Sequence, residues 1–449
     1  MLNKKYDSCF IGLNYISLIN GIAKLKTGKS ALIIDDAKYS FANQWFLNIG
    51  ELEKGVLEEI GTQFEISALK DIQSYLKNEN TILRLNETII EFSDDYFLNL
   101  KELARKVPEC LKDYFIHEIE NLNKTSFNQE MDILLDTIKR NSLHCKNPEE
   151  LNTVFSMNQF YTFQLFEYFS DFLNTDDPLA KQLHFVLQMS FQNIFSNEVI
   201  NLENRYLFLA LLTKRYKIDN NQLMRDLKQE FTRLGGDLKA TQISDWGIRD
   251  EHIHYVLLKS IDGVTEITDC YYYGQLNLQP KFEMRQEVNK FSSIIISYAL
   301  DHPYTDYFRN KRVICNDDKK MGSDFPYWEF SLDHLGHLQA IYSYTDQLGT
   351  KASFYYNQAL EDLYQSLVGI FPGLDRDHWF AAAELKNGLD SWYEYPGLQK
   401  MNLIPKSPKP VHQQYYFEDQ KIKNLHFMGP ERGQILGFYG YLIDLFSEV

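Results

Sequence analysis

The stretch Tyr6-Asp-Ser-Cys-Phe-Ile-Gly12-Leu-Asn14-Tyr-Ile-Ser17 begins the segment that decides the fold. Its apolar run from Ser8 to Ile11 ends at Gly12, which is typical of a buried parallel strand followed by a tight turn. Residues 15–26 then carry apolar side chains at helical spacing, and Thr27-Gly28 ends that helix. The pattern therefore predicts a strand, a glycine turn and a helix in that order.

A second strand is predicted directly after this helix. The apolar run Ala31–Ile34 is followed by two acidic residues, Asp35 and Asp36. An acidic side chain at the end of the second strand of a βαβ unit accepts hydrogen bonds from an adenosine ribose. We therefore predict a dinucleotide-binding βαβ unit in which Asp35, with Asp36 beside it, lies at the ribose.

The glycine fingerprint of such a unit, G-x-G-x-x-G, is only partly present. Gly12 is the first glycine, Asn14 replaces the second and Ser17 replaces the third. Asparagine tolerates unusual backbone angles, but its side chain takes up space next to the phosphates, whereas serine is small enough for close packing of helix and strand. Because the helix N-terminus still attracts anions, we predict that Gly12, Asn14 and Ser17 lie over a pyrophosphate.

Two further segments have the pattern of the same domain. Residues 220–234 form an amphipathic helix that ends at Gly235-Gly236, and strands are predicted at 238–244, 254–260 and 270–273, with a turn at Asp262-Gly263. Near the C-terminus, Leu425-His-Phe-Met-Gly429-Pro-Glu431-Arg432-Gly433 reads as a strand and a glycine turn before a helix. The simpler alternative is a strand and helix that only complete the sheet.

Together, these three segments resemble the FAD-dependent amine oxidase and phytoene desaturase superfamily of flavoproteins. In that superfamily a final strand ends in a glycine followed by an acidic residue, and the next helix points at the flavin. Gly429 matches this glycine, while Glu431 lies one position later than the usual acidic residue. The resemblance implies bound FAD, with Gly429, Glu431, Arg432 and Gly433 along the flavin.

The N-terminal segment is also similar to that of the Rab GDP-dissociation inhibitors and Rab escort proteins. In those proteins, which share the fold but bind no flavin, a Tyr-Asp pair opens the first strand and an aspartate closes the second, as Tyr6-Asp7 and Asp35 do here. Flavin enzymes usually continue with a basic residue and a glycine pair, whereas no glycine follows Asp36 until Gly50. This second resemblance implies a non-catalytic prenyl-protein chaperone.

Composition limits the function classes. The chain has 449 residues and 44% hydrophobic residues, which is enough for two or three folded domains. Its net charge of −16 argues against a nucleic-acid partner and a polybasic membrane anchor. Without an apolar signal segment or an 18-residue apolar span, we expect no transmembrane segment and a cytoplasmic location. The 29 Tyr and 31 Phe reflect either coding bias or an aromatic-lined tunnel for an apolar substrate.

The remainder of the chain is predicted to form the substrate side. We assign residues 1–60, 215–276 and 405–449 to the dinucleotide-binding domain and residues 61–214 and 277–404 to a substrate-binding domain. Residues 51–214 read as mostly helical, with helices at 66–76, 95–111, 131–143 and 157–195. Strands are expected at 292–298 and 338–344, a helix at 359–370, and a Pro-rich linker at 403–410.

The sequence contains few candidate catalytic or metal-binding residues. His252 and His254 read as solvent-exposed side chains near a turn, and His334 and His337 as a satisfied structural pair, rather than as metal ligands. Cys9 and Cys270 read as buried thiols inside strands. The isoalloxazine of a flavin can accept a hydride without catalytic side chains, so missing motifs do not exclude a redox enzyme.

The predicted fold is an α/β, Rossmann-like FAD/NAD(P)-binding domain, discontinuous in sequence, with an inserted substrate domain of mixed sheet and helices. The predicted function is an FAD-dependent oxidoreductase acting on a small or lipid-like apolar substrate by desaturation, amine oxidation or flavin-assisted isomerisation. The alternative is a non-catalytic binding protein or chaperone on the same fold, without flavin. The chain could also associate with a second copy of itself as a homodimer.

Overall fold

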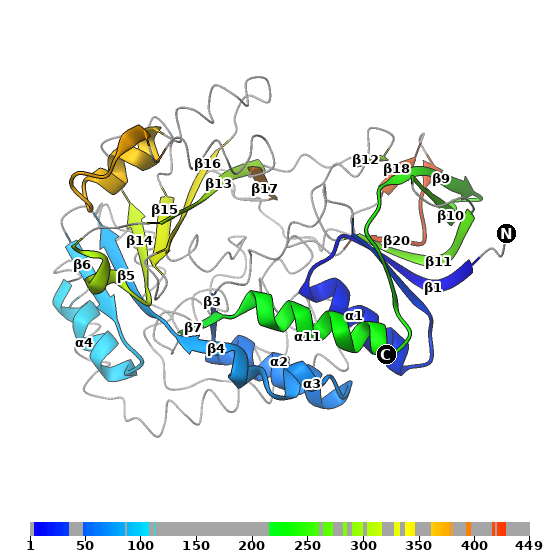
Figure 1. Ribbon diagram of the computed structural model, residues 1–449, viewed down its shortest axis with the longest axis horizontal. Coiled ribbons are helices and arrows are strands. Elements are labelled where there is room, and N and C mark those ends of the chain that lie inside the picture. Colours follow the sequence, from blue (N-terminus) through cyan, green and yellow to red (C-terminus); the bar gives the residue numbers. More distant parts are fainter. Residues whose placement is uncertain are drawn as a thin grey trace.

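The computed structural model describes sixteen segments of the chain, and Figure 1 shows two large sheets at opposite ends of the view with a small sheet between them. The described residues are 4–35, 48–85, 88–106, 112, 215–259, 264–272, 282–284, 290–299, 303–316, 327–332, 337–345, 361–377, 379, 392–396, 415–417 and 420–427. The helices predicted at 131–143 and 157–195, the turn at Asp262-Gly263, His334 and the whole of the 403–410 linker fall outside them.

The first sheet contains both predicted strands of the βαβ unit. Its order is β8 (Asp237–Lys239), β2 (Ala31–Ile34), β1 (Lys4–Ile11), β11 (Val264–Tyr272), β10 (His252–Leu258) and β9 (Ile243–Arg249), and β20 (Leu425–Phe427) also pairs with β11. The β8–β2, β2–β1, β1–β11 and β11–β20 pairings are parallel, whereas β9 and β10 are antiparallel. This is a Rossmann-like α/β fold, and the predicted fold class is confirmed.

The two long helices of this domain begin and end where the sequence predicts. They are α1 (Tyr15–Lys26) and α11 (Asn220–Arg233). The strand predicted at 238–244 is wrong, because residues 237–239 form β8 and residues 243–249 form β9, at opposite edges of the sheet. The strand predicted at 270–273 begins earlier than expected, since β11 starts at Val264 and pairs with β1 along most of its length.

Two cysteines lie side by side in the centre of this sheet. Cys9 on β1 pairs directly with Cys270 on β11, and both side chains are fully buried in the apolar cluster under β9 and β10. Burial raises the pKa of the Cys270 thiol well above its ordinary value. The prediction that both thiols are buried inside strands is confirmed.

Asn424 fastens β20 to two other strands. Its Oδ1 accepts a hydrogen bond from Ile253 N at 2.7 Å, and its Nδ2 donates to Ile253 O at 2.8 Å and to Thr268 O at 2.6 Å. Asn424 is buried, and its backbone oxygen accepts a further bond from Cys270 N. One amide side chain thus joins β10, β11 and the residue preceding β20.

The second large sheet is built from two distant parts of the chain. Its order is β17 (Trp392–Pro396), β13 (Lys290–Ala299), β16 (His337–Thr345), β15 (Tyr327–Leu332), β14 (Lys311–Asn316), β5 (Asn80–Leu85) and β6 (Thr88–Phe92). The strands predicted at 292–298 and 338–344 are confirmed as parts of β13 and β16. Helical residues 361–368 pack their apolar side chains on this sheet, around Leu363, Leu367 and Trp379.

The other described elements lie outside the two large sheets. These are α2 (Glu51–Gln63), α3 (Ser67–Lys70), a 3-10 helix (Ile72–Tyr75), α4 (Tyr96–Lys106) and α12 (Thr305–Phe308), together with the small sheets β3–β7–β4 (Asn48–Gly50, Arg215–Ile218, Leu76–Asn78) and β12–β18–β19 (Phe282–Met284, Tyr415–Phe417, Gln420–Lys421). The prediction of a mostly helical 51–214 segment is wrong at 76–92, where three strands replace helix. The domain limits given above stay a prediction.

Among the helices that are described, none is long and apolar enough to cross a membrane.

α1 approaches α11 closely because α1 carries a glycine at the contact. A Cβ atom built on Gly21 would lie 2.7 Å from Cε2 of Phe231, whose side chain is fully buried. Phe231 also packs against Gly236, the second glycine after α11. The two helices therefore depend on a small residue at position 21.

We expect Gly21→Ala to destabilise the protein by about 1–3 kcal/mol, because the added methyl overlaps a buried ring that cannot move away. Helix propensity alone would make Gly21→Ala stabilising by about 1 kcal/mol. A loss of stability would therefore point to the packing against Phe231. Urea unfolding measures it. The double variant Gly21→Ala/Phe231→Leu should be less destabilised than the sum of the single variants, and a Gly21→Ala protein as stable as the parent would contradict this packing.

Candidate functional site

The turn between β1 and α1 has the backbone of a dinucleotide-binding loop. Gly12 has a φ of 97°, in the left-handed region that glycine adopts without strain. Its backbone N–H donates to Ile34 O at 2.9 Å, which joins the carboxyl ends of β1 and β2. The first glycine of the fingerprint therefore has the conformation that the motif requires.

Asn14 and Ser17, which replace the other two glycines, bond to each other. Asn14 is the N-cap of α1, and its Oδ1 accepts from Ser17 N at 2.9 Å. In return, Asn14 N donates to Ser17 Oγ at 2.9 Å, and Ser17 Oγ donates to Asn14 O at 2.9 Å. This reciprocal capping box satisfies two of the backbone donors that a helix N-terminus otherwise presents to a ligand.

The whole turn is buried. Asn14 and Ser17 are both 0% exposed, and all the residues from Gly12 to Ser17 are buried. Within the described part of the chain, Asn14 Nδ2 has no hydrogen-bond acceptor. A buried donor without a partner costs about 1–3 kcal/mol, so this atom is a candidate ligand contact.

Asp35 lies where the sequence predicts, directly after β2. Its backbone N–H donates to Lys239 O at 2.8 Å, which extends the β2–β8 pairing, and its side chain is half-buried. The structure thus brings Gly12, Asn14, Ser17 and Asp35 to one edge of the sheet. The other predicted site residues, Asp36, Gly429, Glu431, Arg432 and Gly433, lie outside the described residues.

An aromatic row that the sequence did not reveal lies next to this edge. Phe10 stacks on Tyr271 and Tyr271 on His426, each with ring centroids 4.9 Å apart, across β1, β11 and β20. Lys24 Nζ of α1 lies 5.5 Å from the Tyr271 ring centroid. Only the register of three strands from distant parts of the chain aligns these rings, so sequence periodicity could not have found them.

Asp269 adds a charge to the end of this row. His426 Nε2 lies 3.6 Å from Asp269 Oδ1 on the neighbouring strand. The neighbouring His426 imidazole holds the pKa of Asp269 below its ordinary value, against the opposing effect of burial. Both side chains are partly exposed, so this contact lies at the surface, at the end of the aromatic row.

His252 and His254 lie beside a turn as predicted, with His254 exposed and His252 partly exposed. His252 Nδ1 lies 2.8 Å from Asp250 O, and His254 Nε2 lies 3.2 Å from Arg249 O. Both contacts fasten the turn between β9 and β10, where Asp250 and Glu251 have positive φ. In the described residues, no group of three or more His, Cys, Asp or Glu side chains could hold a metal ion.

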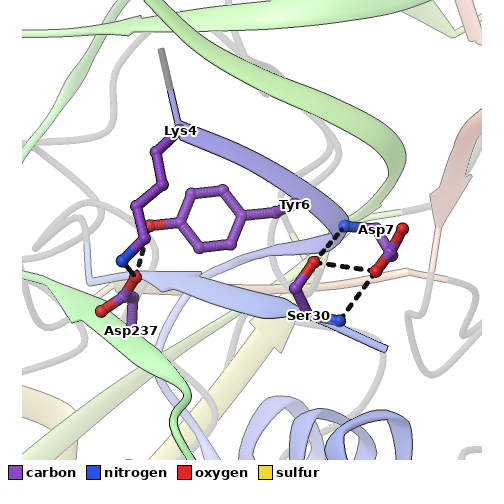
Figure 2. A network of polar contacts seen from close by, with 5 residues as sticks. All are labelled: Lys4, Tyr6, Asp7, Ser30 and Asp237. Atoms are coloured by element: carbon purple, nitrogen blue, oxygen red, sulfur yellow. Dashed lines mark hydrogen bonds and ion pairs between the residues drawn. The ribbon is translucent and has the colours of Figure 1, made fainter. Parts of the chain in front are cut away.

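A second polar cluster lies at the opposite edge, at the amino ends of the strands (Figure 2). Tyr6 OH donates to Asp237 Oδ2 at 2.5 Å, and Lys4 pairs with the same carboxylate. Asp7 Oδ2 accepts from both N and Oγ of Ser30 at 2.8 Å, and Asp7 N donates to Ser30 Oγ. Because ligands of open α/β sheets bind outside the carboxyl ends, this cluster has a structural role.

The carboxylates in this cluster are held ionised. The backbone N–H of Ser30, followed by its hydroxyl, lowers the pKa of Asp7. Burial would raise the pKa of Asp237, but hydrogen bonds from Lys4 and Tyr6 outweigh it and hold the value below the ordinary one. Burial, with the Asp237 bond, raises the pKa of Tyr6.

No family model matches the chain, and no curated protein matches it either. Among solved structures, Rab GDI from Plasmodium falciparum is similar over 99% of this chain and 97% of its own, with 10% identity and a TM-score of 0.49. An oxidoreductase from Methanosarcina mazei is similar over 98% and 99%, with 9% identity and a TM-score of 0.49. The p-nitrophenol 4-monooxygenase of Pseudomonas putida is similar over 100% of this chain and 80% of its own, with 8% identity and a TM-score of 0.44. Likeness at this level carries no argument about activity.

We expect Asp237→Asn to weaken the cluster in Figure 2 by about 1–3 kcal/mol at pH 7, since the charged acceptor of two donors is lost. A lowered folded-state pKa contributes stability above the unfolded value of about 4 and loses it as the pH falls. The variant should therefore lose less stability than the parent between neutral and acid pH. Urea unfolding at both pH values tests this, with the exposed Asp306→Asn as control. Equal acid sensitivity of Asp237→Asn and the parent would contradict it.

Proposed function

We propose that the chain is an FAD-dependent oxidoreductase that acts on a small or lipid-like apolar substrate. The observation that supports this is the N-terminus of α1, which follows the left-handed Gly12 at the carboxyl end of β1 and holds the buried donor Asn14 Nδ2. A phosphate oxygen is the acceptor that such a helix end favours, through its N–H groups and its dipole.

The residues present fit this group in type and position. The first turn of α1 contains no acidic residue that would repel phosphate. Asn14 Nδ2 would donate to a phosphate oxygen, and the Asp35 carboxylate would accept from the ribose hydroxyls. On the flavin side, the superfamily resemblance assigns Gly429, Glu431, Arg432 and Gly433.

The chemistry divides between cofactor and protein. When bound, FAD supplies the isoalloxazine that accepts a hydride in desaturation, amine oxidation or flavin-assisted isomerisation. The chain's own residues would orient the cofactor through the turn at Gly12 and the carboxylate of Asp35. The many aromatic residues of the chain, 29 Tyr and 31 Phe, support an apolar substrate.

A second candidate function rests on the capping box. Because Asn14 N and Ser17 N are bonded within the turn, the same fold could serve as a binding protein that holds no flavin, as the resemblance to Rab GDP-dissociation inhibitors implies. Such a protein would bind an apolar or lipid-like ligand without changing it. A cytoplasmic location and a homodimer stay predictions under either function.

The visible spectrum of the purified full-length chain separates the two functions. We expect the absorption of oxidised flavin, bleached by dithionite, or its appearance after incubation with FAD followed by gel filtration, because the isoalloxazine is the chromophore and the electron acceptor. A colourless protein that retains no added FAD would overturn the oxidoreductase and favour the binding protein.

We expect Asp35→Ala to weaken FAD binding about tenfold or more, because a hydrogen bond to a charged acceptor is worth about 1.5–3 kcal/mol and about 1.4 kcal/mol is a factor of ten. Quenching of FAD fluorescence during titration measures the affinity. Asp306→Ala, on α12 beside the second sheet, is the matched control. Unchanged affinity in Asp35→Ala would show that the ribose lies elsewhere.

A further inference from the structure

The helix N-terminus at the fingerprint already has its own acceptors. Ser17 Oγ accepts from Asn14 N, and Asn14 Oδ1 accepts from Ser17 N, both at 2.9 Å. In a turn with glycines at both positions, these two N–H groups would have no side-chain acceptor and would point at a ligand. Asn14 and Ser17 therefore differ from the fingerprint glycines in more than backbone flexibility. Their side-chain oxygens accept the hydrogen bonds that a bound anion would otherwise accept.

The contacts within the box are mutually dependent. Ser17 Oγ also donates to Asn14 O, so one hydroxyl accepts from and donates to the same residue. Both side chains are fully buried, which means that water does not compete for these bonds. A pyrophosphate that approaches the turn must displace the Asn14 and Ser17 side-chain oxygens before it can accept from the backbone.

One donor is left over. The Asn14 amide oxygen, Oδ1, accepts from Ser17 N, which fixes the orientation of the amide group. In this orientation the amide nitrogen, Nδ2, is buried and has no acceptor among the described residues. Nδ2 therefore marks the direction from which an acceptor would come, while the two backbone donors behind it are occupied. The turn retains an attraction for phosphate but opposes the full set of contacts.

We propose that the Asn14–Ser17 capping box is an internal competitor of the pyrophosphate, and that these two residues set the dinucleotide affinity of this turn. The proposal rests on the proposed function, since it concerns the same site. Under this proposal the native turn binds a dinucleotide weakly, and substitutions of Asn14 or Ser17 change that affinity. The effect is specific for phosphate, because neither residue caps the ribose end at Asp35.

The test uses three full-length variants. Ser17→Ala removes one acceptor and keeps good helix propensity, whereas Asn14→Gly and Asn14→Gly/Ser17→Gly restore the fingerprint glycines. Asp95→Gly is the matched control, because Asp95 Oδ1 caps α4 through Leu98 N at 3.1 Å beside the second sheet. Thermal unfolding identifies any variant that does not fold, and Ser17→Ala is the variant whose fold is least disturbed.

The probes are FAD, ADP and adenosine, titrated against each variant by fluorescence or calorimetry. We expect FAD and ADP to bind the double variant at least tenfold more tightly than the parent, Ser17→Ala to bind them with an intermediate gain, and Asp95→Gly to show no change. Adenosine, which lacks the pyrophosphate, should bind all the variants equally.

Each other outcome has a definite meaning. If the parent binds FAD and the folded variants bind it no more tightly, or less tightly, the competitor proposal is overturned and the proposed function stands. If the parent binds no FAD but the double variant does, the proposal is supported and the flavoenzyme function of the native chain is overturned. If no folded protein binds FAD or ADP, both are overturned.

Discussion

The parallel pairing of β1 with β11 is the contact on which the rest of this structure depends. It joins the first strand of the chain to a strand that begins at Val264, and it places Cys9 beside Cys270 in the centre of the sheet. Both sides of β1 are then occupied, because β2 pairs with its other edge. Buried on both edges, β1 can end in a turn whose position is fixed to the carboxyl ends of its neighbours.

The site inherits its geometry from this pairing. Gly12 lies at the end of β1, and its bond to Ile34 O aligns it with the end of β2. Tyr271 and His426 reach the same edge only because β11 and β20 run parallel to β1 in register. The edge therefore combines a phosphate-type turn with an aromatic row, although the residues come from three distant segments.

Local sequence predicted most of the βαβ unit and the helix that packs on it. The helices at 15–26 and 220–233 begin and end as predicted, since apolar periodicity and terminal glycines act within one element. The split of residues 237–249 into two strands at opposite edges was missed, because strand order is set by distant pairing and not by local pattern. The strands β4 to β6 were missed for the same reason: β5 obtains its second neighbour, β14, from Lys311 onward.

The candidate site was predicted in position but not in detail. The spacing placed Gly12, Asn14, Ser17 and Asp35 correctly at one edge, yet the sequence suggested that Asn14 would crowd a phosphate and that Ser17 was merely small. Their reciprocal bonds show a different relation, in which each side chain satisfies the backbone of the other. An Asn and a Ser three residues apart do not form the usual Ser/Thr and Glu/Gln capping signature, so only the three-dimensional structure reveals the pair.

The bonds of Asn424 bear on how the protein is made. A nascent chain that has emerged as far as β11 holds the β10–β11 hairpin, but Ile253 N, Ile253 O and Thr268 O still lack the side chain that bonds to them. The edge of β11 that receives β20 also stays open until residues 425–427 have been synthesised. Since unpaired edges are prone to associate, the dinucleotide domain carries an open edge from the synthesis of β11 until that of β20. Of the strands that the structure describes, β20 is the last to join this sheet, so the β11 edge is covered only late in synthesis.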